Sequence, residues 1–345
     1  MIKVSEFGRM SNGSVVKSYT LSNENGMEVS ILSLGALMQR VLVPDRDGVK
    51  RDVTLGFDDV LYYEKGINNF GSIIGRNANR IKNGSFVIDG KKYQMALNDG
   101  INNLHSGFYG YHLRLFTAEM LQEENAVRFM LMSPDGDQGF PGNAVITVTY
   151  TLTQENAIEI FYEAVSDKDT IMNLTNHAYW NLNGHAEGSI EKHLLKIDST
   201  YYTPLLVNQT PDGSCRPVEG TPFDFREFKE IGRDINAGGD QLLFGNGYDH
   251  NFMINGKGMR EHAVLKGEVS GISMTILSDL PAIQFYSGNG IDTKTPGKEG
   301  KYYQLRGGLA LETQYVPDAM NLDGYKSPIL KAGEKYETKT IFRFE

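Results

Sequence analysis

The sequence predicts an all-β fold, a large antiparallel β-sandwich. Short segments of alternating apolar and polar residues recur along the chain, and clusters of Asn, Asp and Gly separate them at close spacing. Helical signals are sparse and short, the best lying at 55–63 and 106–110. Many short strands with turns between them are typical of sandwiches and barrels.

Period-two alternation marks the strands most clearly. In residues 145–152, Ile146, Val148 and Tyr150 share a face opposite a row of threonines. The same pattern recurs at 157–165, 272–277 and 338–344.

A hairpin is expected at 86–93, because Asp89-Gly90 suits the two left-handed positions of a type I′ turn. No linker, charge run, low-complexity tract or repeat divides the chain. We therefore expect residues 1–345 to form one β domain, since all-β units can reach this length.

Composition excludes several classes of function. The chain has 34 basic and 43 acidic residues and a formal charge of −9, which argues against nucleic-acid binding. A single cysteine excludes an intrachain disulfide and indicates a reducing compartment. No window approaches the ~18 apolar residues of a membrane span, and the first residues lack a signal peptide's apolar core. We expect a cytoplasmic protein without a membrane partner, although a periplasmic chain with its signal removed would look the same.

The most informative segment runs from residue 173 to 182. If it is extended, His177, Tyr179 and Asn181 share one face, and Trp180 lies on the opposite, apolar face. An imidazole, a phenol and an amide together suit a polyhydroxylated ligand. The alternative is a core histidine that bonds a neighbouring backbone group.

A second unusual segment, residues 309–315, contains one carboxylate in an otherwise uncharged strand pattern. Ala310, Glu312 and Gln314 share a face of this strand. A carboxylate on a central strand is costly to desolvate, so its pKa should rise and make it a good general base. A solvated glutamate on an edge strand is the alternative.

Three polar loops could contribute further ligand contacts. Residues 75–81 contain two arginines and two asparagines. These side chains could donate hydrogen bonds to ligand hydroxyls, or the segment could be a solvated turn. His105 lies in a Gly/Asn-rich loop, where it could bind a ligand or could be an exposed surface residue without a role in binding. Asp249, in a Gly-flanked loop beside a histidine, could accept bonds from sugar hydroxyls or cap a turn.

Motifs for metals, cofactors and a nucleophilic serine do not occur. The chain has no His-Glu-x-x-His, Walker or Gly-x-Ser-x-Gly sequence, and no glycine-rich dinucleotide fingerprint follows a strand. We expect neither a metal site nor a cofactor.

Five segments together resemble the aldose 1-epimerase (galactose mutarotase) family, and they follow the family's order. They are Gly-Arg-Asn-Ala-Asn-Arg-Ile at 75–81, Asn-Asn-Leu-His-Ser-Gly at 102–107, Thr-Asn-His-Ala-Tyr-Trp-Asn-Leu at 175–182, Tyr-Asp-His-Asn-Phe at 248–252 and Leu-Glu-Thr-Gln at 311–314. The resemblance implies a mutarotase-like β-sandwich that interconverts α and β anomers of aldohexoses such as galactose and glucose in an open cleft.

The resemblance also implies residue roles. His177 would be the acid and Glu312 the base. The sugar hydroxyls would be held by Arg80 with Asn79 beside it, His105, Asp249 and Gln284, and we add Tyr179 from the polar face described above. Trp180 stands where many family members have Phe, a change that should affect packing more than chemistry.

Other functions stay open from the residues alone. A non-catalytic carbohydrate-binding β-sandwich would have no use for a desolvated Glu312 opposite His177. A glycosidase typically needs two carboxylates, for which Asp249 and Glu312 are the convincing pair. A hexose-phosphate epimerase of the same superfamily should require a basic phosphate pocket. The expected partner is a small aldose sugar, and the protein could be a monomer or a homodimer.

Overall fold

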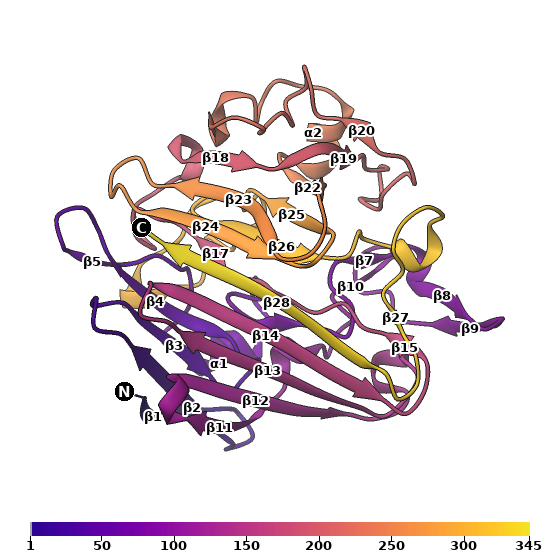
Figure 1. The fold of residues 1–345 in the computed structure, drawn as a ribbon, viewed down its shortest axis with the longest axis horizontal. Helices are drawn as coiled ribbons and strands as arrows, with labels where there is room; N and C mark the ends of the chain where they lie inside the picture. Colours follow the sequence, from indigo (N-terminus) through magenta and orange to yellow (C-terminus); the bar gives the residue numbers. More distant parts are fainter. Residues whose placement is uncertain (1) are drawn as a thin grey trace.

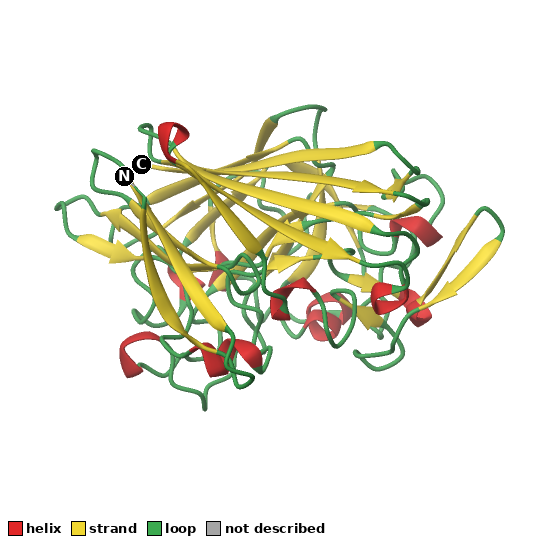
Figure 2. Cartoon of the chain, turned by 90° about the horizontal axis from the view of Figure 1, so that it is seen from below, coloured by secondary structure: helices red, strands yellow, loops and turns green. Residues whose placement is uncertain are grey.

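The computed structural model describes residues 2–345, and the predicted all-β architecture is confirmed. Every strand pair within its sheets is antiparallel. Figure 1 shows the strands in overlapping layers, and Figure 2 shows that most of the short helical turns gather on one side of the strands. Among residues 2–345, no helix is both long and apolar enough to cross a membrane.

Three sheets form most of the molecule. The five-stranded sheet has the order β1 (Lys3–Arg9), β2 (Val15–Ser22), β3 (Glu28–Leu32), β4 (Met38–Pro44) and β5 (Lys50–Asp52). The nine-stranded sheet has the order β11 (Thr117–Leu121), β12 (Ala126–Ser133), β13 (Ala144–Leu152), β14 (Ala157–Ser166), β28 (Lys335–Phe344), β24 (Ser273–Ser278), β23 (Arg260–Lys266), β18 (Leu194–Ile197) and β21 (Lys229–Glu230). The six-stranded sheet has the order β17 (Tyr179–Trp180), β26 (Leu309–Gln314), β25 (Ala282–Tyr286), β22 (Asp249–Ile254), β19 (Ser199–Thr203) and β20 (Arg216–Pro217).

Smaller elements complete the fold. The two-stranded pairs are β6 (Ile73–Ile74) with β16 (Thr175–Asn176), β7 (Arg80–Ile81) with β10 (Asn103–Leu104), β8 (Ser85–Ile88) with β9 (Lys91–Gln94), and β15 (Thr170–Ile171) with β27 (Ile329–Leu330). The α-helices are α1 (Val60–Glu64) and α2 (Asp240–Gly245).

The main core lies between the nine-stranded and six-stranded sheets. Trp180 of β17 is fully buried, with its ring centroid 5.0 Å from that of Phe342 and 5.8 Å from that of Phe344, both on β28. Leu309 and Leu311 of β26 join the same core. Because side chains alternate along a strand, Ala310, Glu312 and Gln314 point to the opposite face, where the pocket lies. The predicted core orientation of Trp180 is confirmed.

Most of the predicted elements are present. The strands expected at 145–152, 157–165 and 338–344 lie within β13, β14 and β28, and that at 272–277 is displaced by one residue in β24. The hairpin of β8 and β9 turns at Asp89 and Gly90, whose φ angles of 48° and 77° fit a type I′ turn.

The helical expectations were largely wrong. Of residues 55–63, only the last four belong to a helix, α1, which Asp59 caps by accepting a bond from the Leu61 amide. Residues 106–110 form turns. His105, Ser106 and Gly107 all have positive φ, which a right-handed helix cannot accommodate.

The segment 173–182 is not the continuous strand that we predicted. It pairs through β16 with β6 and then, after a bend, through β17 with β26. The bend is stabilised by the Asn176 side chain, which accepts a bond from the Ala178 amide and donates one to the Gly71 carbonyl. His177 therefore lies at the change of partner between two sheets.

Candidate active site

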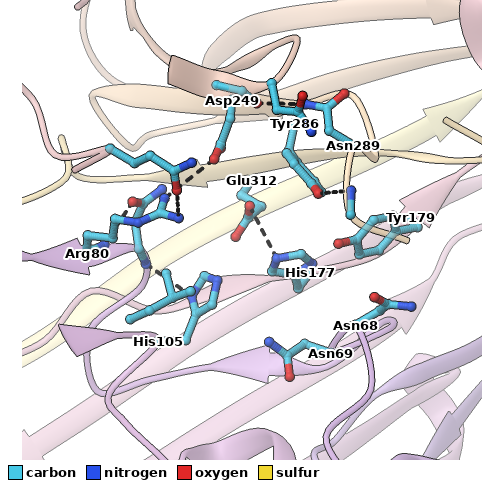
Figure 3. A pocket seen from close by; sticks show the side chains of 16 residues that line it. Asn68, Asn69, Arg80, His105, His177, Tyr179, Asp249, Tyr286, Asn289 and Glu312 are labelled. Carbon is cyan, nitrogen blue, oxygen red and sulfur yellow. Dashed lines mark hydrogen bonds and ion pairs between the residues drawn. The ribbon is translucent and has the colours of Figure 1, made fainter. Parts of the chain in front are cut away.

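The pocket in Figure 3 lies over the face of the six-stranded sheet that carries Glu312. Its volume is about 320 Å³, at the small end of ligand sites. It is lined by Asn68, Asn69, Asn79, Arg80, Leu104, His105, His177, Tyr179, Gln209, Gly245, Asn246, Asp249, Tyr286, Asn289, Gly290 and Glu312.

Strand register places the polar groups in rows across the sheet. Asn251 of β22 lies opposite Gln284 of β25, and Gln284 lies opposite Glu312 of β26. Tyr179 is the partner of Ala310, so extending that register by two residues brings His177 beside Glu312. The Nε2 atom of His177 is 3.6 Å from Oε1 of Glu312, too long for a hydrogen bond.

Burial sets the protonation of this pair. Both side chains are less than a tenth exposed. Burial, reinforced by the charge of Asp249, raises the pKa of Glu312 well above its ordinary value, although Arg80 opposes the shift. Burial also lowers the pKa of His177 to about 4. Burial therefore favours the neutral form of both groups, so a single proton shared by the free pair rests on the carboxyl side.

His105 completes a cluster of three titratable groups. Its ring lies edge-on to that of His177, with centroids 5.1 Å apart. Its Nδ1 accepts a hydrogen bond of 3.2 Å from the backbone amide of Asn79, so the neutral ring carries its proton on Nε2. Burial keeps the pKa of His105 well below its ordinary value, and the ring stays neutral.

His105, His177 and Glu312 also offer potential metal-ligand atoms within 4.8 Å of one another. A metal-binding imidazole nitrogen must be free of its proton and of other bonds. In His105 one nitrogen is bonded to the Asn79 amide and the other is protonated. This arrangement suits hydrogen-bond donation better than metal ligation.

Arg80 is held by three partners at one end of the pocket. Its Nε donates to Asp99 at 2.7 Å, one terminal nitrogen lies 3.4 Å from Asp249, and the other donates to the side-chain Oε1 of Gln209. Burial alone would lower the pKa of Arg80, but the carboxylates of Asp249 and Asp99 outweigh it and raise the pKa. The guanidinium is therefore charged and fixed in orientation.

Asp249 and Gln284 form a second rigid unit. The Gln284 amide donates to Asp249 Oδ1 at 2.7 Å, so the other carboxylate oxygen of Asp249 is the one near Arg80. The structure thus brings Asp249, Gln284 and Arg80, which come from distant segments, to one side of Glu312.

Two tyrosines close the other end. Tyr179 and Tyr286 both lie opposite the small residue Ala310, and their ring centroids are 6.0 Å apart. The Tyr179 ring also stacks on His177 at 5.1 Å. Burial raises the pKa of Tyr179, which keeps its hydroxyl protonated.

Two residues from the polar patterns lie elsewhere. The Asn181 side chain is fully buried and donates to the carbonyls of Gly188 and Gly307. Arg76 is also buried and binds Ser133 and the carbonyls of Pro141 and Gly142. Both are structural: β17 ends at Trp180, so Asn181 lies beyond the strand that carries Tyr179, and Arg76 faces a different set of loops.

The sequence did not reveal six other polar or aromatic lining residues, which are Asn68, Asn69, Gln209, Tyr286, Asn246 and Asn289. For Asn68 and Asn69 a signal existed, because a tandem Asn pair lies between Gly66 and Gly71. Gln209 and Tyr286 stand in unremarkable polar and strand-like contexts.

The fold and the pocket define an antiparallel β-sandwich with an open polar site and a buried acid–base pair. Residues 17–343 match the family model described as aldose 1-epimerase. The chain belongs to this family.

Full-length relatives support the assignment. The chain is 38% identical to a human galactose mutarotase over 340 residues, which cover 98% of this chain and 97% of the human protein. It is also 38% identical to an aldose 1-epimerase of Haemophilus influenzae, with 97% of each chain covered. The solved structure of a galactose 1-epimerase from Lactobacillus acidophilus has a TM-score of 0.87 at 30% identity, covering 100% of this chain and 98% of that one. A GalM/aldose epimerase homologue from C. elegans has a TM-score of 0.88 at 31% identity, covering 94% and 98%.

Proposed function

We propose that this protein is an aldose 1-epimerase, an isomerase that interconverts the α and β anomers of aldohexoses such as galactose and glucose. His177 and Glu312 are its proton-transfer pair. The observation that carries the assignment of roles is the 3.6 Å separation of His177 Nε2 and Glu312 Oε1. In an aldopyranose the C1 hydroxyl and the ring oxygen are bonded to the same carbon, so their acid and base must lie side by side.

The reaction begins with ring opening. Glu312 takes the proton of the C1 hydroxyl, the C1–O5 bond breaks as the aldehyde forms, and O5 takes a proton from His177. Rotation about the C1–C2 bond presents the other face of the aldehyde. O5 then attacks C1, returns its proton to His177, and the aldehyde oxygen takes back the proton from Glu312.

The protonation preference of the free pair supports this sequence. After ring opening Glu312 is neutral and His177 has lost its proton, which is the state that burial favours. The ion pair needed for ring opening is therefore the costly form, and the open-chain stage is relatively stabilised. Proton transfer by positioned groups typically contributes ~10²–10⁴-fold to rate.

The binding contacts follow from the same placement. Arg80 and Asp249 line the pocket where they can hold hydroxyls next to C1. Gln284, which is buried and does not itself line the pocket, orients Asp249, and the backbone amide of Asn79 orients His105. His105 donates through Nε2–H, and Tyr179 offers its hydroxyl beside His177. These groups fix the sugar against the acid–base pair.

The alternatives are less well supported. A binding module has no need for a carboxyl whose pKa is raised by burial beside a histidine. Retaining and inverting glycosidases use two carboxylates across the scissile bond, whereas here Glu312 lies 3.6 Å from an imidazole nitrogen. Among the described lining residues of the pocket, Arg80 is the one Lys or Arg, and two carboxylates already engage it, which disfavours a sugar phosphate.

The test is polarimetry of freshly dissolved α-D-galactose. Catalytic amounts of the protein should accelerate the decay of optical rotation to the same final value that buffer reaches slowly. Heat-denatured protein is the control. An unchanged decay rate with folded protein would refute the proposal.

A further inference from the structure

One wall of the pocket is formed by the segment from Asn68 to Ser72, on the far side of His177 from Glu312. The His177 amide donates to the Ser72 carbonyl at 2.9 Å, and the Gly71 amide donates to the His177 carbonyl at 3.0 Å. Across the sheet the order of groups is therefore Asp249, then Glu312, then His177, then Asn69 (Figure 3), with Gln284 opposite Glu312 on the Asp249 side.

This segment is held firmly. The buried ring of Phe70 lies 5.0 Å from Tyr179 and 5.2 Å from Phe57, measured between centroids. Gly71 approaches the backbone of Met38 so closely that an added Cβ would lie 2.1 Å from its carbonyl oxygen. Asn69 itself is left-handed, with φ 51°, and its carbonyl accepts a bond from the Ser72 amide.

The side chain of Asn69 is available to a ligand. It is half-buried and lines the pocket, and it has no hydrogen bond to another residue of the described chain. The neighbouring Asn68 is tethered, because its Oδ1 accepts a bond of 3.4 Å from the Asp292 amide. An amide offers both a donor and an acceptor, which suits a hydroxyl.

The ring order of a pyranose matches the order of these groups. C2 is bonded to C1, C1 to O5, and O5 to C5, which bears the exocyclic C6 hydroxymethyl of a hexose. With C1 at Glu312 and O5 at His177, as the proposed function requires, C2 lies toward Asp249 and C5 toward Asn69. We propose that Asn69 binds the C6 hydroxyl and thereby gives the enzyme its preference for aldohexoses over sugars that lack this group.

The experiment compares D-galactose with two sugars of the same configuration at C2 to C4. These are D-fucose, which lacks only the C6 hydroxyl, and L-arabinose, which lacks C6 altogether. For the wild type we expect kcat/KM for D-galactose to exceed that for D-fucose by about 3- to 10-fold, the effect of one neutral hydrogen bond. In Asn69→Gly, which keeps the left-handed backbone, the ratio should fall toward one.

The matched control is Asn83→Gly. Asn83 has φ 54°, is exposed and lies outside the pocket, so this variant should keep the wild-type ratio. Thermal unfolding of both variants checks folding. A galactose-to-fucose ratio that is unchanged in Asn69→Gly, or an equal loss with all three sugars, would overturn the assignment. A wild type that anomerises none of the three would instead refute the proposed function itself.

Discussion

Glu312 of β26 and His177 at the bend before β17 are neighbours across the sheet, with Oε1 and Nε2 3.6 Å apart. Neither Glu312 Oε2 nor His177 Nδ1 has a hydrogen-bond partner among the described residues. Buried polar atoms are normally paired, and unpaired ones recur at functional sites. The relationship is therefore one of two titratable groups held close together without the usual hydrogen-bond partners.

The pH dependence of the rate should be bell-shaped. Activity requires one proton on the pair, so it should fall at low pH as the imidazole takes a second proton, with a His177 pKa of about 4. It should fall at high pH when the pair loses its proton, above the raised pKa of Glu312. The two limbs belong to the coupled pair rather than to either residue. A kcat that climbs steadily from about pH 4 to about pH 10 would contradict the pairing.

This assignment of the limbs reverses the one that sequence reasoning gives. An imidazole and a carboxyl with ordinary pKa values would lose activity at low pH through Glu312 and at high pH through His177. Burial favours the neutral form of each group, because it raises the pKa of Glu312 and lowers the pKa of His177. The order in which the two groups titrate is therefore reversed.

Arg80→Lys should reduce kcat/KM by about 10-fold or more. The substitution keeps the charge but removes the planar guanidinium group that binds Asp99 and Asp249 together. Steady-state polarimetry with D-galactose measures the effect, which should appear mainly in KM. Arg128→Lys is the control, since Arg128 forms an exposed pair with Glu119. Equal effects of the two substitutions would show that Arg80 does not position the sugar.

Trp180→Phe should leave kcat and KM within about 2-fold of the wild type and reduce the free energy of unfolding by less than about 1.5 kcal/mol. The Trp180 ring packs against Phe342 and Phe344 on the core side of β17, and its indole nitrogen has no partner there. Urea unfolding and the sugar assay measure the two effects. A large loss of kcat with normal stability would mean that the core side of this strand controls the chemistry.

Much of the fold and site could be predicted from short-range patterns. Alternation located β13, β14 and β28, and the lone carboxylate in β26 identified Glu312. Asn181 was misplaced because β17 ends at Trp180 and the Asn181 side chain bonds to the carbonyls of Gly188 and Gly307, contacts that no local pattern encodes. Asn69 and Gln209 were missed because both reach the pocket through left-handed loop positions fixed by tertiary packing.

The central claim is tested most directly by kcat for Glu312→Gln, measured by polarimetry with α-D-galactose. Gln keeps the size of the side chain but cannot accept the proton, so kcat should fall by ~10²-fold or more. His177→Asn should likewise lower kcat through loss of the proton donor to O5.

The same variant carries its own folding control. Because the folded-state pKa of Glu312 lies above its ordinary 4.5, the folded wild type holds a proton that the unfolded chain loses as pH rises. Glu312 should therefore contribute a loss of stability above about pH 4.5, so the stability of the wild type relative to that of Glu312→Gln should decrease as pH rises from there. A stable Glu312→Gln with near-wild-type kcat and only a raised KM would contradict the account, whereas a stable variant with kcat reduced ~10²-fold or more is the predicted result.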